Sequence, residues 1–486
     1  MSQPDPQTGE SPGPQPPSMP LALLPICALV VLLAGAYGLY GDAAATGPNQ
    51  IALMLAGVVA LAVGHVCGHD MEDMREAAMA SVTTGLPALF ILLAVGALIG
   101  TWAMSGTLVA MVYWGLKILS PDYFYFTVVL ICAATALCIG SSWTVAGTLG
   151  IGLMGVSVQM GLNPAITAGA IISGAYFGDK SSPLSDSTNL ATAAAGSNLY
   201  AHIVETLWTS VPSLLIALAL FWMLGEPGEF DASPITDRLA ADFNVGLVPF
   251  VPLVLVLGMA VGRVSPFLTI FIGALAGGVV AVLINPGNVL AVAQGGDLPQ
   301  ALALLKGVWT ALAIGYHSET GIPALDQLLS RGGMESMLIT IWLILAALAF
   351  GGIVDHIGVL DRVLAPVLRA ARTTGRLVLA LVVTGIGTNA LASDQYIAIV
   401  LPGKLFQRAF QRMNLAPVVL SRAVGDSSTV TSALVPWNSC GAYMAATLGV
   451  ATVNYLPFAF FNLFNPLVTV AFGFLGWRMI KRDPAA

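Results

Sequence analysis

The stretch Ser173-Gly-Ala-Tyr-Phe-Gly-Asp-Lys-Ser-Ser-Pro-Leu-Ser-Asp-Ser-Thr-Asn189 decides the fold of this chain. It carries two aspartates and several hydroxyl side chains, yet it lies between an apolar run and an alanine-rich run. Pro183 lacks a backbone donor and clashes with the preceding turn, so we expect a helix to break there. Backbone groups freed by such a break are tolerated at membrane depth only inside protein or beside water. The stretch therefore predicts a buried, oxygen-rich cation site.

A similar stretch lies further along the chain, at a constant offset of 247 residues. Gly178-Asp-Lys-Ser-Ser-Pro-Leu-Ser185 aligns with Gly425-Asp-Ser-Ser-Thr-Val-Thr-Ser432, and the two are identical at the glycine, the aspartate and two serines. The same offset aligns Gly140-Ser-Ser-Trp143 with Gly387-Thr-Asn-Ala390. Two matches at one offset indicate an internal duplication. Transporters built from repeats place their site at the repeat interface, on discontinuous helices.

The composition is that of a membrane protein. The chain is 57% hydrophobic and 9% charged, whereas soluble domains are about 25% charged. Because a helix of about 18 or more apolar residues can cross a bilayer, we predict an all-α polytopic membrane protein. About 10–13 transmembrane helices are expected, in two structural repeats with broken helices or re-entrant hairpins. The five cysteines have no metal-ligand spacing and are expected to be small buried hydrophobes.

The chain divides into four regions. Residues 1–19 are rich in Pro, Ser and Gln without Lys or Arg, and predict a disordered tail. The first membrane half is expected at 20–286 with its motif at 140–190, then a polar connecting region at 287–335, then a second half at 336–480 with its motif at 387–441. The densest basic cluster comprises Arg362, Arg369, Arg372 and Arg376. The positive-inside rule places this cluster, and the C-terminus with Arg478, Lys481 and Arg482, in the cytoplasm.

Four aspartates are embedded between apolar segments: Asp179, Asp186, Asp394 and Asp426. Burial and neighbouring carboxylates favour the protonated form of an aspartate, whereas bound sodium favours the ionised form. One site can therefore hold the cation or protons but not both, which is the basis of antiport. Hydroxyl and amide side chains complete the predicted cation- and proton-binding set: Ser142, Thr144, Ser181, Asn189, Asn389, Thr429, Thr431 and Asn438. Sodium is expected in the region of Asp179 and Asp426.

Structural roles are the alternatives for these residues. Asp179 and Asp426 could cap helices or form ion pairs, with Lys180 and Arg422 as charge partners, since Arg422 lies one helical turn before Asp426. Asp186 could cap a helix after the Pro183 break, and Asp394 could begin a helix at a membrane edge. The hydroxyl and amide side chains could simply satisfy backbone groups.

These motifs resemble the C-type bacterial sodium/proton antiporters, the NhaC family of the ion-transporter superfamily. The match rests on Ser173 to Leu190, Asp394-Gln-Tyr396 with Leu401-Pro-Gly403, Asp426-Ser-Ser-Thr-Val-Thr-Ser432 and Val435-Pro-Trp-Asn-Ser-Cys-Gly441. It extends from about Gly85 to Phe472. The resemblance implies a secondary transporter in a bacterial inner membrane that exchanges cytoplasmic Na⁺ for external H⁺, with the two Gly-Asp regions facing each other.

We therefore expect Na⁺/H⁺ antiport by alternating access, with Na⁺ and H⁺ as transported ions, lipid as surroundings, no cofactor and no nucleic-acid partner. No nucleophile–base pattern favours an enzyme, and a homodimer is left possible. The alternative is a Na⁺- or H⁺-coupled transporter of a small carboxylate or amino acid, because relatives of the resembled family exchange malate for lactate. Lys180, Lys404 and Arg422 are the cations that could anchor such an anion.

Overall fold

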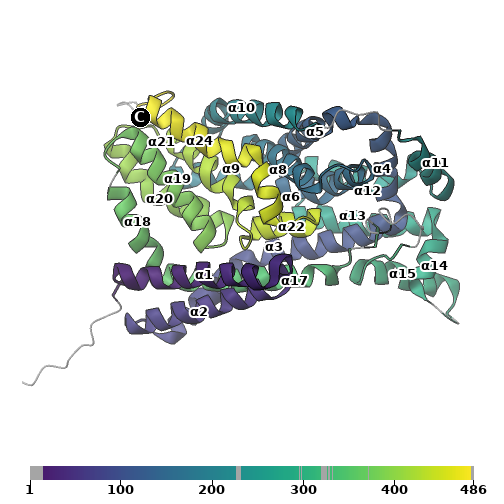
Figure 1. Ribbon diagram of the computed structural model, residues 1–486, viewed down its shortest axis with the longest axis horizontal. Helices are drawn as coiled ribbons and strands as arrows, with labels where there is room; N and C mark the ends of the chain where they lie inside the picture. Colours follow the sequence, from purple (N-terminus) through teal and green to yellow (C-terminus); the bar gives the residue numbers. More distant parts are fainter. Residues whose placement is uncertain are drawn as a thin grey trace, which may run out of the picture.

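The described residues of the computed structural model form helices throughout, apart from turns and one isolated bridge between Leu415 and Lys481 (Figure 1). The structure describes residues 15–225, 231–294, 296, 298–318, 326, 329, 330, 332–369 and 371–482. Most of the predicted N-terminal tail, residues 1–14, lies outside this range, and α1 begins at Met19. The predicted all-α membrane fold is confirmed.

Eight described helical segments are long and apolar enough to cross a membrane. They are α1 (Met19–Tyr40), α2 (Pro48–Val66), α3 (Met71–Ser105), α5 (Phe124–Ile139) with the preceding turn, α10 (Leu199–Met223), α13 (Pro266–Ile284), α17 (Leu338–His356) with the preceding turn, and α19 (Thr374–Leu391). A pair bent by 56°, Thr452–Phe458 and Phe460–Leu475, would make a ninth span. The sequence-based number of about 10–13 also included the polar motif segments, which fail this test of length and composition.

The remaining described helices are shorter or more polar. In the first half they are α4 (Thr107–Ile118), α6 (Ser142–Val145), α7 (Ile151–Gln159), α8 (Pro164–Ser181), α9 (Asp186–Ala195), α11 (Ser233–Asp242), α12 (Val251–Val261), α14 (Pro286–Ala293) and α15 (Gln300–Ala313). In the second half they are α18 (Val359–Arg369), α20 (Gln395–Arg412), α21 (Pro417–Val424), α22 (Ser439–Leu448), α23 (Thr452–Tyr455) and α24 (Phe460–Leu475). Two π-helical turns, η3 (Ala146–Gly150) and η6 (Gly425–Thr429), follow α6 and α21.

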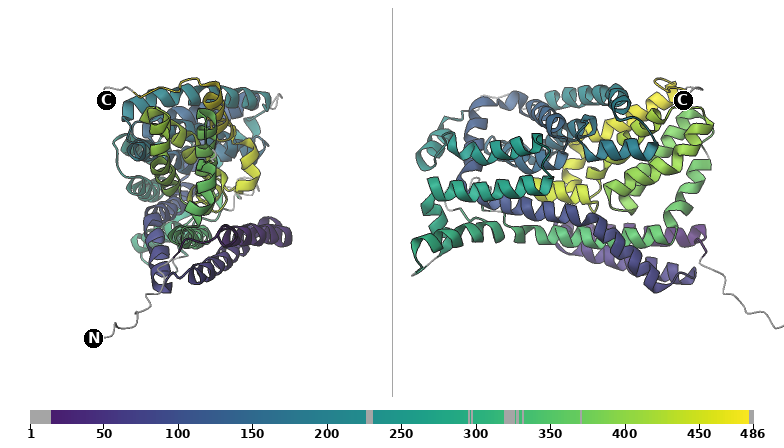
Figure 2. Two further views of the ribbon diagram at one scale, coloured as in Figure 1. Left: turned by 90° about the vertical axis from the view of Figure 1, so that its left-hand side faces the viewer. Right: turned by 180° about the vertical axis from the view of Figure 1, so that it is seen from behind.

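The N-terminal helices form one side of the molecule. Figure 2 shows α1 and α2 as a pair that projects from the rest of the bundle, and they pack against each other along their length. The long helix α3 connects this pair to the remainder by packing against α13 and α17. The predicted connecting region 287–335 contains all of α14 except its first residue and the whole of α15. Residues 295, 297, 319–325, 327, 328 and 331 of this region lie outside the described range.

The motif stretch read first in the sequence comprises the end of α8, a turn and the start of α9. Helix α8 ends at Ser181 and α9 begins at Asp186, with Pro183 between the two. Ser185 caps α9 by accepting from the Thr188 amide at 3.5 Å. Pro183 thus stands where the helix ends, as its missing donor requires. The division of the chain into two repeats stays a prediction.

Glycines on α8 allow this helix to lie directly against α5. A Cβ added at Gly178 would lie 2.5 Å from the Ala133 carbonyl oxygen and 2.5 Å from the Ala136 Cβ, and Gly174 faces the Val129 carbonyl in the same way. Only glycine fits such contacts, because small residues let helix backbones approach closely. This packing brings the end of α8 next to the end of α5.

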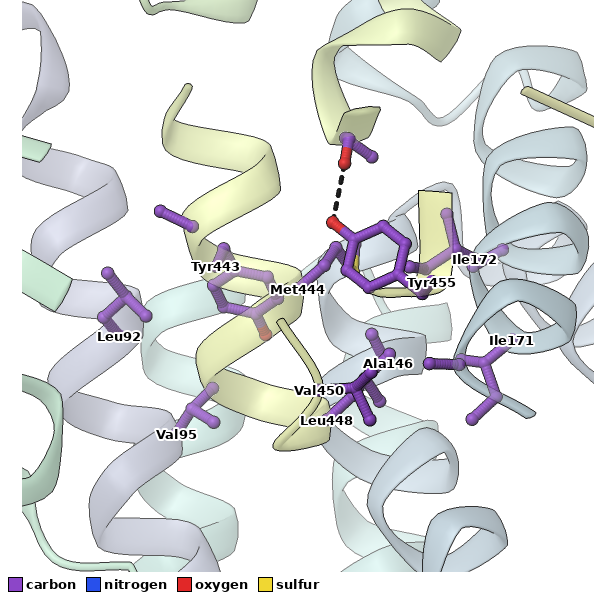
Figure 3. Packing of buried hydrophobic residues seen from close by; sticks show 14 of the residues in the cluster. Leu92, Val95, Ala146, Ile171, Ile172, Tyr443, Met444, Leu448, Val450 and Tyr455 are labelled. Carbon is purple, nitrogen blue, oxygen red and sulfur yellow. Dashed lines mark hydrogen bonds between the residues drawn. The ribbon is translucent and has the colours of Figure 1, made fainter. Parts of the chain in front are cut away.

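An apolar core between α22, α3 and α8 fixes the segment after α5 (Figure 3). Tyr443 of α22 stacks on Trp143 with ring centroids 4.0 Å apart, and its hydroxyl donates to the Trp143 carbonyl at 2.8 Å. Tyr455 donates to the Ala433 carbonyl at 2.6 Å. Each phenol is buried with its hydroxyl satisfied, as a buried tyrosine requires. The contact of Tyr443 holds the residues on either side of Trp143, including Ser142, in place.

Candidate functional site

A cavity of about 710 Å³ lies where the motif segments meet α3 and the turn between α12 and α13. Five of the predicted site residues line it: Thr144, Asp179, Asp186, Asn189 and Asp394. Ser141, Ser185, Ser187, Gln395, Tyr396 and Ser439 contribute further polar groups, and Arg263 stands at the α12–α13 turn. The cavity therefore combines three carboxylates with hydroxyl and amide groups, the oxygen donors that hard cations prefer.

Asp179 is a buried carboxylate of the cavity and is held by hydroxyl groups. Its Oδ2 accepts from the Ser142 amide at 3.1 Å and the Ser142 hydroxyl at 2.6 Å. Its Oδ1 accepts from the hydroxyls of Ser185 and, at 3.4 Å, Ser187. Within the described ranges no basic side chain forms an ion pair with Asp179. A buried carboxylate surrounded by neutral donors beside a cavity lacks a counter-ion, and a cation could supply it.

The other two cavity carboxylates have different surroundings. Asp394 caps α20 by accepting from the Ile397 amide at 3.0 Å, so it begins a helix, as the structural alternative expected. Asp186 is exposed and occupies the first turn of α9, where an acidic residue favours the helix dipole. The cap of α9 is Ser185, so the capping role considered for Asp186 is wrong.

Asp426 lies outside the cavity lining and is fully buried in a separate group of polar residues. It forms an ion pair with Lys180 and accepts from the Thr209 hydroxyl at 3.0 Å and from the Thr469 hydroxyl. The Lys180 ammonium also donates to Ser210 Oγ and to Asn465 Oδ1, each at 2.9 Å. We call Asp426, Lys180, Thr209, Ser210, Asn465 and Thr469 the Asp426 cluster. The two motif aspartates are thus linked through adjacent residues of α8, because Asp179 faces the cavity and Lys180 faces Asp426.

Arg422, expected as a partner of Asp426, forms its ion pair elsewhere. Its Nη1 lies 3.2 Å from Glu205 Oε2, and it also donates to the Arg478 carbonyl at 3.2 Å. Arg478 forms a second ion pair with Glu205. The ion-pair partner of Asp426 is instead Lys180, which lies 246 residues away along the chain. Helical spacing alone favoured Arg422, and tertiary packing decided otherwise.

Three of the four predicted amide and hydroxyl side chains of the second motif donate to backbone carbonyls. Asn389 donates to the Ser428 carbonyl at 2.7 Å and to Thr431 Oγ1 at 3.0 Å, while Asn438 donates to the Asn389 carbonyl at 3.1 Å. Thr431 donates to the Ser427 carbonyl at 2.7 Å, and the Thr429 carbonyl accepts from Ser432 at 2.8 Å. These contacts support the structural alternative.

Three predicted residues of the first motif also have local contacts. Thr144 donates from its backbone and hydroxyl to Ser141, the cap of α6, at 3.2 and 3.0 Å. Asn189 donates to the Ser185 carbonyl at 2.8 Å. The Ser181 hydroxyl is buried, and the described residues offer it no hydrogen-bond partner. Thr144 and Asn189 therefore shape the turns around the cavity.

Sequence reasoning missed the residues on α10 and α24 that complete the Asp426 cluster. Thr206, Thr209, Ser210 and Ser213 recur at helical spacing along one buried face of α10. Asn462, Asn465 and Thr469 do the same on α24. Polar residues on one face of an otherwise apolar span usually face the bundle interior. This periodic pattern of polar residues could have predicted from the sequence that α10 and α24 contribute to a buried polar site.

A histidine pair lies outside both polar groups: His69 is in the connection between α2 and α3, and His356 is the last residue of α17. The rings of His69 and His356 meet edge to face with centroids 5.3 Å apart. Burial, and next the neighbouring His356, lower the pKa of His69 below its ordinary value of 6.5, against the opposing charge of Asp73. The folded protein therefore favours neutral His69.

A bundle of apolar helices long enough to cross a membrane, arranged around a carboxylate-lined cavity, is the architecture of a multi-pass membrane transporter. The sequence model of the Na⁺/H⁺ antiporter family matches residues 174–477. The chain belongs to this family, as its motifs predicted.

Its curated relatives differ in what their names say they carry. The chain is 35% identical to the Na⁺/H⁺ antiporter NhaC of Alkalihalophilus pseudofirmus, over 90% of this chain and 92% of that protein. It is 33% identical to the arginine/ornithine antiporter ArcD of Halobacterium salinarum, over 96% and 94% of the two chains. It is 32% identical to the malate-2H⁺/Na⁺-lactate antiporter of Bacillus subtilis, over 88% and 90%.

Proposed function

We propose that this protein exchanges cytoplasmic Na⁺ for external H⁺ by alternating access, and that Asp179 binds the transported cation. The observation that carries the proposal is the surroundings of Asp179: a buried carboxylate with hydroxyl neighbours, open to a cavity and without a basic partner in the described chain. Family membership supports Na⁺ and H⁺ as the ions.

The groups around Asp179 suit a sodium ion chemically. Ser142, Ser185 and Ser187 each present a hydroxyl that now donates to the carboxylate. A hydroxyl also has two lone pairs, so the same side chains can turn toward a bound cation as ligands. Sodium bound there would take the place of hydrogen bonds that now stabilise the negative charge.

Competition between Na⁺ and H⁺ follows from the burial of Asp179. A bare buried carboxylate is costly, so it is occupied by either a proton or a cation. Binding one ion displaces the other, and exchange follows when the occupied transporter changes the side to which the cavity opens. The proposed cycle has no chemical conversion and uses only the transported ions.

Asp186 and Asp394 act in this proposal at the approach to Asp179. Both line the cavity, and neither forms an ion pair among the described residues. Carboxylates that line a cleft concentrate cations locally. They would therefore raise the rate at which sodium reaches Asp179, whereas Asp179 itself would set the affinity.

The proposed orientation places the C-terminus in the cytoplasm of a bacterial cell. In Figure 1 the C-terminus lies at the same end of the molecule as α18, α20 and α21. Basic residues gather on these elements and on the last residues: Arg362, Lys404, Arg408, Arg412, Arg478, Lys481 and Arg482. Such an accumulation marks the cytoplasmic side. A green fluorescent protein fused to the C-terminus is expected to fluoresce, and an alkaline phosphatase fusion is expected to be inactive.

Everted membrane vesicles test the exchange. A proton gradient is established and read with a pH-sensitive dye, and sodium chloride alone is expected to dissipate it in vesicles that contain the wild-type protein. Asp179→Asn is expected to abolish the response. Asp237→Asn on the exposed surface of α11 is the matched control and is expected to respond normally. A normal response of Asp179→Asn, with normal sodium affinity, would refute the assignment.

The size of the cavity favours one second candidate, the coupled transport of a small carboxylate or amino acid. About 710 Å³ is within the range of cavities that hold small organic molecules, and Arg263 in the lining could bind a carboxylate. The relatives named for arginine/ornithine and for malate and lactate exchange point the same way. Dissipation of the gradient only after one of these substrates is added would establish this second function.

A further inference from the structure

The Lys180 ammonium occupies the position of a bound cation in the Asp426 cluster. Its Nζ contacts three oxygens that belong to three different helical elements: the Asp426 carboxylate on η6, Ser210 Oγ on α10 and Asn465 Oδ1 on α24. Lys180 is 1% exposed and Asp426 is 0% exposed. Carboxylate, hydroxyl and amide oxygens are also the ligands that a sodium ion takes.

We infer that the Lys180 ammonium permanently takes the place of a cation at Asp426, the aspartate of the second motif. The protein then exchanges one sodium ion, which binds at Asp179. This inference rests on the proposed function and adds the number of exchangeable sites to it. The ion pair excludes sodium from Asp426, because a second positive charge among the same oxygens would meet the buried ammonium directly.

The alignment of the two motifs explains why only one of the two aspartates has a lysine as its ion-pair partner. The residue after Asp179 is Lys180, whereas the corresponding residue after Asp426 is Ser427. The Ser427 hydroxyl donates to the Ala423 carbonyl of its own helix at 2.7 Å. The second motif therefore supplies no basic side chain to Asp179, whereas the first motif supplies Lys180 to Asp426. The two related carboxylates thereby acquire different roles.

Removing the ammonium would leave Asp426 without its counter-charge. A buried charge that loses its partner is strongly unfavourable, but the oxygens of Thr209, Ser210, Asn465 and Thr469 would remain in place around it. Methionine matches the length of the lysine stem and suits a buried position. In Lys180→Met, sodium is therefore expected to enter the Asp426 cluster as a second ion.

Saturation binding of radioactive sodium to the purified full-length protein in detergent counts the sites. The wild type is expected to bind one sodium ion per chain, and Asp179→Asn is expected to bind none. Lys180→Met is expected to bind two, and Lys180→Met combined with Asp179→Asn is expected to bind one. Lys180→Met combined with Asp426→Asn removes both charges and is expected to bind one, at Asp179.

Each other result overturns a stated part of the reasoning. Two sites in the wild type, or one site in folded Lys180→Met, would show that Lys180 only clamps the helices together. If Lys180→Met does not fold, two measurements still decide: the number of sodium ions bound by the wild type, and binding to the variant that combines Lys180→Met with Asp426→Asn. Loss of sodium binding in that folded double variant would overturn the inference. No saturable binding to the wild type would refute the proposed function itself.

Discussion

Replacing Gly178 with alanine would test whether the contact of α8 with α5 forms the cation site. The added Cβ would lie 2.5 Å from the Ala133 carbonyl oxygen, whereas non-bonded atoms prefer about 3.5 Å. The two helices would have to separate by about 1 Å at this level. Such overpacking typically costs about 1–3 kcal/mol of stability.

The same displacement would disturb Asp179, the next residue along the chain. Ser142 Oγ lies 2.6 Å from Asp179 Oδ2, and a separation of about 1 Å would lengthen this contact beyond the hydrogen-bond range. The Ser142 hydroxyl would then also be out of reach of a sodium ion at Asp179, and losing such a contact to a charged group costs about 1.5–3 kcal/mol. Since 1.4 kcal/mol is about tenfold in affinity, we expect Gly178→Ala to weaken the apparent sodium affinity about 10- to 100-fold.

The assay is sodium-dependent dissipation of a proton gradient in everted vesicles, titrated with sodium to obtain the half-maximal concentration. Gly57→Ala on α2 is the matched control, because nothing lies within 4 Å of its added Cβ. It is expected to leave sodium affinity and thermal stability unchanged. Wild-type sodium affinity in a folded Gly178→Ala variant would refute the reasoning that close α5–α8 packing positions Asp179.

Three further variants examine single contacts. Ser142→Ala removes a hydroxyl that can turn to bind sodium but keeps the amide contact to Asp179, so we expect about tenfold weaker sodium affinity in the same titration. Glu205→Ala leaves Arg422 buried without its ion pair and is expected to cost about 3–5 kcal/mol. Its unfolding temperature should fall well below that of Glu72→Ala, whose exposed pair contributes about 0–1 kcal/mol, and equal temperatures would contradict this. His69 has a pKa lowered below 6.5, so its stabilising contribution is present above that pH and is lost as pH falls through the lowered pKa. His69→Gln should lose less thermal stability than the wild type between neutral and mildly acidic pH, and parallel losses would refute the assignment.

The class of protein could be predicted from the sequence because it depends on composition and on the length of apolar segments, not on which segments meet in space. A low charge content and long apolar segments require a membrane-spanning helical bundle whatever the tertiary arrangement is. The end of α8 could also be predicted from the local sequence, because Pro183 prevents the helix from continuing through its own backbone. The motif around Asp179 was specific enough to predict the family.

The different partners of the two motif aspartates were decided only by tertiary structure. Asp179 and Asp426 look alike in sequence, and spacing along one helix suggested Arg422 as the partner of Asp426. Packing of α8 against α10 and α24 instead brings Lys180 to Asp426, and packing against α5 brings Asp179 to Ser142. Ion pairs between distant segments depend on which helix faces meet in space. The sequence by itself determined a membrane antiporter with buried aspartates, and the fold determined which of the two motif aspartates is paired with a lysine.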